Sequence, residues 1–356
     1  MTSKAFGLAQ LGNAFADGAL SNRNKIINGA MTIDQRNAGA AVTPADLQYT
    51  LDRWNAGLTQ ASKFSVQRST EAPAGFTNSL LVTSLSAFSV ASDDLFRVSQ
   101  HIEGFNVADL GWGTAGAKPA TLSFWVRSSL TGTFSGALIN SAANRSYPFT
   151  FDIGAADTWE QKSITIEGDT TGTWLTTNGI GIRLGFSLGA GSIYSGPAGT
   201  WAGAIYTAAT GATSVVATSG ATFYLTGVQL EAGDTATPFE HRSYGQELAL
   251  CQRYYFQDGP YSGSFGSGCH YRTDLALYHY RLPIVMRASP TFTVSAASDF
   301  RSVANNSTFV GSGLAASFLT SVAARLDLTI SGASSGDGTV LEHANGNAKL
   351  MFSAEL

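Results

Sequence analysis

The stretch YLTGVQLEAGDTATPFEHRSYGQELALCQRYY, residues 224–255, changes its pattern three times and thereby divides the chain. It begins with an apolar strand from Tyr224 to Leu230, followed by a turn around Gly233. An extended crossing is predicted at Thr237-Pro-Phe, and a helix from Ser243 onward. The stretch therefore predicts a junction between two β regions.

The helix is expected over residues 243–256. Ser243 is a suitable N-cap, and Gln246 three residues later is its capping-box partner. An apolar stripe at i, i+4, i+7 and i+11 comprises Tyr244, Leu248, Cys251 and Tyr255. We expect this helix to pack about the symmetry axis of an oligomer, with Tyr244, Leu248 and Tyr255 as candidate interface residues.

Composition limits the possible classes of protein. The chain has 356 residues, enough for two or three domains, and 44% of them are hydrophobic. Only 13% are charged, about half the usual share, which is typical of extended β proteins, shells and fibres. The net charge is −4 and no basic cluster occurs, so nucleic acid is not expected as a partner. Two cysteines, Cys251 and Cys269, do not make a disulfide framework.

Short alternating strands separated by turns fill the region from Trp54 to Leu230. Residues 95–103 place Phe96, Val98 and Ile102 on one face, and residues 121–127 place Leu122, Phe124 and Val126 inward. Strands at this spacing without intervening helices predict a mostly β chain with an antiparallel sandwich or barrel.

Four segments follow from these patterns. We expect an N-terminal attachment or oligomerisation segment at 1–23, a β-sandwich at 24–240 (a jelly roll by the resemblance described below), a linking helix at 241–258 and a smaller C-terminal β domain at 259–356. Residues 24–37 are predicted as a strand interrupted at Asn28-Gly29.

The N-terminal segment has a narrow apolar stripe. Leu8, Leu11 and Phe15 recur at helical spacing, and a short helix of this kind must dock on its own chain, on sister copies or on another protein. The alternative is a frayed terminus. Residues 1–20 lack the pattern of a signal peptide, and no apolar run has the length of a membrane span, so neither secretion nor membrane insertion is expected.

Three sequence blocks carry a family resemblance. They are residues 24–31 with 52–54, residues 122–127 with Trp159 and 227–233, and residues 236–255 with 282–290 and 353–356. The chain resembles the tail-fibre and fibre-like structural proteins of bacteriophages. The second block is similar to jelly-roll modules related to carbohydrate-binding domains, and the third is the most specific.

The resemblance implies a virion protein made in the host cytoplasm. Members of this family are usually homotrimers that bind other virion proteins through the N-terminus and present a distal β domain to the host. The position of this copy on the virion stays open, since a tail fibre and a head-mounted fibre or spike both fit.

Catalytic and metal-binding patterns are weak. No nucleophile elbow occurs, and His270 and His279 are too isolated for a metal pair. Asp169 and Asp337 lie in fragments of calcium loops whose oxygen ligands are incomplete, so no cofactor is predicted and a structural calcium is the alternative. Glu231 and Glu240 could form an acid/base pair, but a strand end and a polar crossing are the expected positions. We predict a protein that is not an enzyme.

Aromatic residues in glycine-rich loops are the candidate ligand contacts. Trp112 lies in one such loop, and Tyr194 and Trp201 lie in another. Sugar binding needs an exposed aromatic face with polar groups around it. Packing within the domain or against a neighbouring subunit is the alternative explanation for these side chains.

These observations predict a homotrimeric virion fibre protein that attaches to the host surface through a glycan. One alternative is an architectural virion component without a ligand of its own. A glycan depolymerase is less well supported, because neither a β-helix repeat nor a carboxylate cluster is present.

Overall fold

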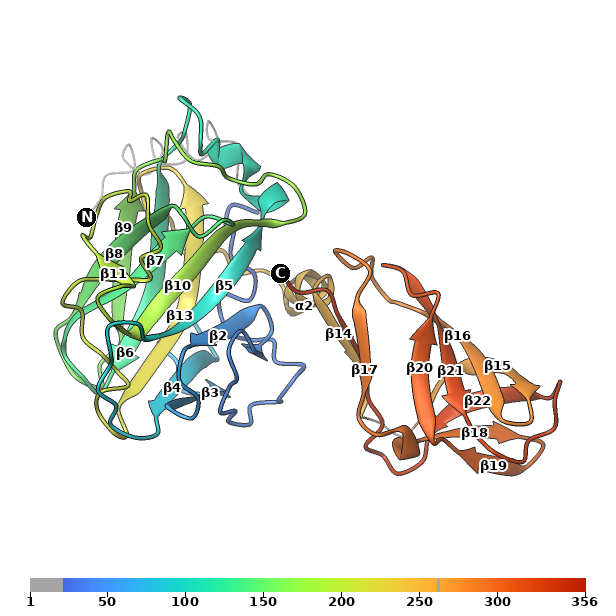
Figure 1. Cartoon of the computed structure of the whole chain (residues 1–356). Helices are drawn as coiled ribbons and strands as arrows, with labels where there is room; N and C mark the ends of the chain where they lie inside the picture. Colours follow the sequence, from blue (N-terminus) through green and yellow to red (C-terminus); the bar gives the residue numbers. More distant parts are fainter. Residues whose placement is uncertain (1–21, 261–262) are drawn as a thin grey trace. The chain divides into compact units, whose positions relative to one another are not determined.

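A computed structural model describes residues 22–260 and 263–356, which form two compact units (Figure 1). The first unit comprises the chain up to Glu247 together with Leu356, and the second comprises Leu248–Glu355. The boundary between the units therefore falls inside the predicted linking segment. Leu8, Leu11 and Phe15 lie outside the described residues, so their proposed role stays a prediction.

Unit 1 is an antiparallel β-sandwich whose two sheets form two layers (Figure 1). The six-stranded sheet has the order β1 (Tyr49–Leu51), β2 (Trp54–Leu58), β5 (Leu95–Glu103), β10 (Ile180–Ala190), β7 (Gly132–Ile139) and β8 (Ser146–Ile153). The five-stranded sheet has the order β3 (Phe64–Ser69), β4 (Ser79–Ser84), β13 (Thr222–Ala232), β6 (Ala120–Ser128) and β9 (Glu160–Ile166). The predicted jelly-roll-like β fold is confirmed.

The core of unit 1 lies between these sheets. Phe124 of β6 and Phe186 of β10 meet edge to face, with ring centroids 5.0 Å apart, and both side chains are fully buried. The alternation predicted for β5 and β6 is observed, because Phe96, Val98 and Leu122 are all buried in this core. Burying a side chain of this size stabilises the fold by about 1.5–3 kcal/mol.

Shorter elements connect the strands of the sandwich. Two one-turn 3-10 helices, η1 (Gly104–Asn106) and η2 (Ala108–Leu110), follow β5. A short parallel pair, β11 (Ser195–Gly196) and β12 (Ala208–Ala209), lies in the long connection from β10 to β13.

Residues 24–37 do not form the predicted strand. Asn28 has a positive φ of 58°, which breaks the extended backbone. Its side-chain amide donates to the carbonyls of Ile33 and Asp52 at 2.8 and 2.9 Å, and its side-chain oxygen accepts from the Ile33 amide. A buried asparagine side chain therefore takes the place of a strand ladder here.

The crossing after β13 is tied to residues 22–26. Glu231 accepts hydrogen bonds from the amide and hydroxyl of Thr237 at 2.9 and 2.6 Å. Glu240 accepts from the amides of Asn22 and Asn24, and Arg242 donates to the carbonyls of Asn24 and Ile26. Both carboxylates thus hold the crossing in place, as the sequence predicted for their positions.

Helix α2 spans Tyr244–Gln252 and ends earlier than predicted. The hydroxyl of Ser243 accepts from the Gln246 amide at 3.4 Å, as expected for an N-cap. Tyr255 lies on strand β14 and not on the helix, and it is buried with 5% exposure. Its assignment to the helical interface stripe is therefore wrong, whereas Tyr244 is 65% exposed and Leu248 is half-buried.

Unit 2 is a second antiparallel β structure. Its three-stranded sheet has the order β14 (Tyr255–Asp258), β23 (Leu350–Ser353) and β17 (Thr291–Val294). Its seven-stranded sheet has the order β19 (Ser307–Val310), β18 (Phe300–Ala304), β22 (Gly338–His343), β15 (Ser264–Arg272), β16 (Leu275–Arg281), β21 (Ala323–Thr329) and β20 (Gly313–Ser317). A 3-10 turn, η3 (Ala297–Asp299), precedes β18. A separate hydrophobic core confirms that this region is β structure of its own.

Candidate functional site

The outer face of the six-stranded sheet, turned away from the sandwich core, carries polar side chains on adjacent strands. Strand alternation decides this, since Phe96 and Val98 point into the core and the residues between and beyond them point outward. We call this surface the polar face; it consists of Asn55, Arg97, Ser99, His101, Ser135, Arg183 and Ser187. Six of the seven are classed as buried and Arg183 is half-buried.

Strand register sets the neighbours on the polar face. Asn55 of β2 lies opposite Ser99 of β5, and the Ser99 hydroxyl donates to the Asn55 side-chain oxygen at 2.6 Å. Arg97 lies opposite Gly57, where a Cβ atom would come within 2.7 Å of the Arg97 Nε. Because Gly57 has no side chain, Arg97 can lie flat across the sheet.

Arg97 is the most unusual side chain of this face. It is 9% exposed, and no hydrogen bond or ion pair joins it to the residues that the structure describes. Burial and repulsion from Arg183 lower the pKa of Arg97 to about 10, and the attraction of Asp46 offsets this only in part. The guanidinium therefore remains charged at neutral pH.

His101 reports the electrostatic character of the same surface. Burial lowers its pKa to about 3, and a hydrogen bond with the Leu356 carbonyl opposes this shift. Repulsion from Arg183, Arg97 and Arg53 lowers the pKa further. Three arginines thus act on one imidazole, so the polar face is locally cationic although the chain carries a net charge of −4.

Several other polar atoms of this face lack partners among residues 22–260 and 263–356. They are Asn55 Nδ2, His101 Nε2, Ser135 Oγ and Arg183 Nε. Arg183 still donates through Nη2 to the Ser141 carbonyl at 2.9 Å. Buried polar groups in native proteins are normally hydrogen-bonded, so a cluster of such atoms on neighbouring strands suggests a bound ligand.

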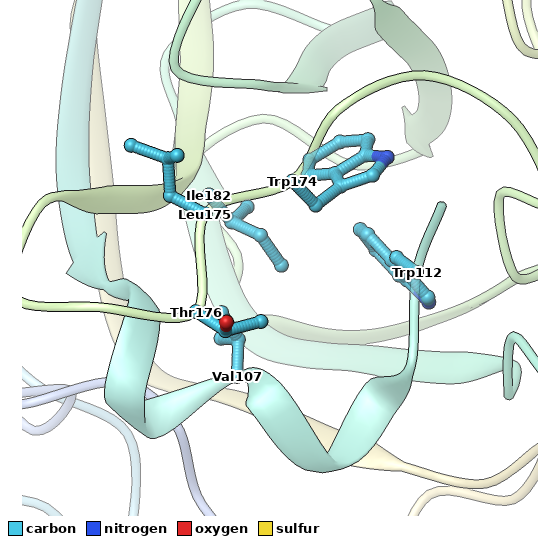
Figure 2. Close-up of a pocket in the computed structure, with 6 residues that line it drawn as sticks. All are labelled: Val107, Trp112, Trp174, Leu175, Thr176 and Ile182. Carbon is cyan, nitrogen blue, oxygen red and sulfur yellow. The ribbon is translucent and has the colours of Figure 1, made fainter. Parts of the chain in front are cut away.

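A tryptophan cluster forms a second aromatic feature of unit 1. The rings of Trp112, Trp174 and Trp201 meet pairwise edge to face, with centroid distances of 4.9 to 5.3 Å. Tyr147 packs on Trp201 at 5.1 Å. Figure 2 shows Trp112 and Trp174 beside a small hollow that is also lined by Val107, Leu175, Thr176 and Ile182. The hollow has room for about one water molecule, so it is too small for a sugar.

An ion pair holds the tryptophan cluster together. Arg145 donates to both carboxylate oxygens of Asp169, at 2.8 and 2.6 Å, and Trp174 Nε1 donates to the same carboxylate at 3.0 Å. Burial raises the pKa of Asp169, but hydrogen bonds from Arg145, Trp174 and the Thr171 backbone outweigh it, so the pKa lies below its ordinary value. The carboxylate is fully engaged and is not placed as a calcium ligand.

The predicted ligand contacts occupy unequal positions. Trp112 is only 6% exposed and donates through Nε1 to the Lys118 carbonyl, so it is not the exposed platform that was expected. Trp201 is half-buried and donates to the Glu167 carbonyl. The structure brings Trp112 and Trp201 together. Tyr194 is half-buried in the loop before β11, and its backbone amide donates to the Gly191 carbonyl.

Sequence reasoning missed Trp174 and the whole polar face. A signal was present in β5, where Arg97, Ser99 and His101 alternate with the apolar residues. Their polarity predicts an outward face, but nothing in the sequence predicts that these side chains are buried, or that Arg97 and His101 Nε2 find no partner among the described residues. Among the described residues, no group of three or more His, Cys, Asp or Glu side chains could hold a metal ion. None of the described helices is long and apolar enough to cross a membrane.

Comparisons with known proteins identify similar structures but no family. No protein-family model matches the chain, and no curated protein matches it. A domain of tailspike protein 4 from bacteriophage CBA120, described as enzymatically active, is similar over 60% of this chain and 22% of its own, with 10% identity and a TM-score of 0.31.

Two smaller proteins are matched over their whole length. A candidate sugar-binding protein from Bacteroides thetaiotaomicron is similar over 59% of this chain and 100% of its own, with 12% identity and a TM-score of 0.36. A family 11 carbohydrate-binding module from a Clostridium thermocellum cellulase is similar over 58% and 100%, with 12% identity and a TM-score of 0.28. At such identities and TM-scores, likeness says nothing about ligand or activity, and the proposals below rest on the geometry of this chain.

Proposed function

We propose that this protein is a non-enzymatic fibre component of a phage virion and that its sandwich binds a host-surface glycan on the polar face. The observation that carries the binding proposal is the cluster of buried polar atoms on strands β2, β5, β10 and β7 that have no hydrogen-bond partner among the described residues. The virion assignment is supported by the resemblance of the three sequence blocks.

Sugars suit such a surface because they present hydroxyl groups at many positions. An amide, an imidazole, a hydroxyl and guanidinium groups can each donate to a sugar oxygen. The strands that carry them lie about 4.8 Å apart, so donors recur along a sugar chain laid across the sheet. A ligand of this kind would supply partners that Asn55, Ser135 and Arg97 lack.

The tryptophan cluster supports this site less directly. The indole N–H groups of Trp112, Trp174 and Trp201 are already bonded within the chain, so they have no hydrogen bond left for a sugar. Half-buried Trp201 could still offer part of its ring. Trp112 is buried and its Nε1 is already bonded, so it is not a direct contact in the proposed site.

Binding is tested with purified full-length chain and immobilised polysaccharides extracted from candidate host envelopes. The wild type is expected to be retained by at least one of them. Ser135→Ala removes a hydroxyl without a protein partner, so it should weaken retention and leave the melting temperature unchanged. Thr308→Ala, on exposed strand β19 of unit 2, is the matched control and should alter neither.

Absence of retention on every polysaccharide would refute the glycan proposal and favour the architectural alternative. Release of new reducing ends from any of them would instead favour a depolymerase. Light scattering tests the homotrimer separately, and a monomer at working concentration would refute that part of the proposal.

A further inference from the structure

Arg97 presents a specific problem of charge on the polar face. It is 9% exposed, it stays protonated at neutral pH, and no group in the described chain pairs with it. Burying a charge is costly unless an opposite charge or hydrogen bonds compensate it. A side chain in this state is expected where a ligand supplies the missing partner.

A second cation lies near the first. On β10, Ser187 is opposite Arg97, Gly185 is opposite Ser99, and Arg183 is opposite His101. Gly185 therefore occupies the row between the two arginines. A Cβ atom there would be 3.5 Å from Arg97 Cδ, so the Arg97 side chain extends over this row. Gly185 is buried, so its missing side chain gives the Arg97 side chain room to lie over β10 toward Arg183.

Acidic groups around the face do not cancel these charges. Asp46 acts on Arg97 more weakly than Arg183 does, and its Oδ1 accepts from the Leu58 amide. Glu103, the next outward residue of β5 beyond His101, is buried and interacts within the chain. Burial is the main cause of the lowered pKa of His101, and repulsion from Arg183, Arg97 and Arg53 adds to it. The cationic character is local, because the whole chain is acidic.

We infer that the glycan bound by the polar face carries an oxyanion, a carboxylate or a phosphate group, which pairs with the guanidinium of Arg97. The inference rests on the proposed function and adds the chemical class of the ligand. A guanidinium presents parallel N–H donors that match the two oxygens of a carboxylate or phosphate. Arg183 lies on the far side of the Gly185 row and adds a second positive charge.

Calorimetric titration of the full-length chain tests this inference with three probes. Trigalacturonic acid carries carboxylates, galactose 6-phosphate carries a phosphate, and galactotriose is the neutral match of the first. The wild type should bind one of the anionic probes at least about tenfold more tightly than galactotriose. The better of the two anionic probes tells carboxylate from phosphate.

Variants of Arg97 separate charge from geometry. Arg97→Gln should weaken binding of the anionic probe about ten- to a hundredfold, the range expected for a charged hydrogen-bonded pair. It should weaken binding of galactotriose by less than about tenfold, because a neutral sugar loses only ordinary hydrogen bonds. Arg97→Lys keeps the charge but loses the paired donors, so its affinity for the anionic probe should lie between those of the wild type and Arg97→Gln. Arg272→Gln, at an exposed arginine of unit 2, is the matched control and should change nothing.

The melting temperature gives an independent readout. Since Arg97 has no partner within residues 22–260 and 263–356, the Arg97→Gln variant should melt at the same temperature as the wild type or at a higher one. A lower melting temperature would mean that Arg97 is structural and would overturn the inference. Equal affinity for acidic and neutral probes, or no binding of either anionic probe, would also overturn it. The proposed function would still stand if the envelope polysaccharides retain the chain, since that test does not depend on Arg97.

Discussion

The tryptophan cluster and the polar face are both built from residue types that bind sugars, but their hydrogen bonds differ. In the cluster, all three indole N–H groups have acceptors within the chain, and Asp169 is held by Arg145. On the polar face, Arg97, Asn55 Nδ2 and Ser135 Oγ have no acceptor or donor among the described residues. Hydrogen-bonded polar groups stabilise a fold, whereas buried polar groups without partners destabilise it unless a ligand supplies the missing hydrogen bonds. The tryptophan cluster is therefore part of the structural core, and the polar face is the region for which we propose binding.

The largest effect on stability is expected when the tryptophan cluster is disrupted. Trp112→Ala should lower the free energy of unfolding by about 4 kcal/mol, because a buried indole is replaced by a cavity. Urea unfolding followed by tryptophan fluorescence measures this. Trp201→Ala should cost less, since Trp201 is only half-buried. A Trp112→Ala protein of wild-type stability that no longer binds glycan would reverse the comparison.

Breaking the ion pair should cost somewhat less. Asp169→Ala leaves Arg145 and Trp174 Nε1 without their acceptor, so we expect about 3 kcal/mol of destabilisation by urea unfolding. Asp327→Ala is the control, because its partner Arg325 is more exposed and such surface pairs contribute less than about 1 kcal/mol. Equal effects of the two substitutions would show that the cluster does not depend on this pair.

Acid should destabilise unit 1 through His101. Its pKa of about 3 in the fold lies below the ordinary value of 6.5, so the unfolded chain binds one more proton between these values and stability falls as pH drops. The loss attributable to His101 should reach about 2 kcal/mol near pH 5. His101→Gln should remove this part of the pH dependence of urea unfolding, and His279→Gln, at an exposed position, should retain it.

The smallest effect on stability is expected on the floor of the polar face. Gly57→Ala would place a Cβ atom 2.7 Å from Arg97 Nε, so the flexible guanidinium must shift and anion binding should weaken, with a stability change below about 1 kcal/mol. The control is Gly185→Ala, whose Cβ atom would lie 3.5 Å from Arg97 Cδ, an ordinary contact that does not force the Arg97 side chain to move. Equal calorimetric affinities for the two variants would mean that Arg97 need not lie flat to bind.

Local sequence patterns predicted much of the fold because burial follows strand alternation. The inward residues of β5 and β6, the Ser243 N-cap and the crossing tied by Glu231 and Glu240 follow from such patterns. The end of α2 did not, because Tyr255 pairs with Ser353 on β23, almost a hundred residues away. Because this pairing is long-range, local sequence patterns could not predict that the helix ends at Gln252.

The candidate site was less predictable than the fold. Trp112 and Trp201 were expected as ligand contacts, and for Trp201 this stays a prediction. Sequence could not show that Trp174 and Asp169 join them or that Trp112 is buried. The polar residues of β5 were visible as an alternating set. Whether each finds a partner depends on side chains brought from β2, β7 and β10.

By itself, the sequence determined a mostly β chain with two β regions and a helical junction, because periodicity and turn residues act locally. The tertiary structure decided which polar groups are satisfied. Register places Gly57 and Ser187 opposite Arg97, and neither they nor any other described residue pairs with its guanidinium. Hydrogen bonding depends on atoms that meet in space, so the difference between a structural cluster and a binding surface appears only in the folded chain.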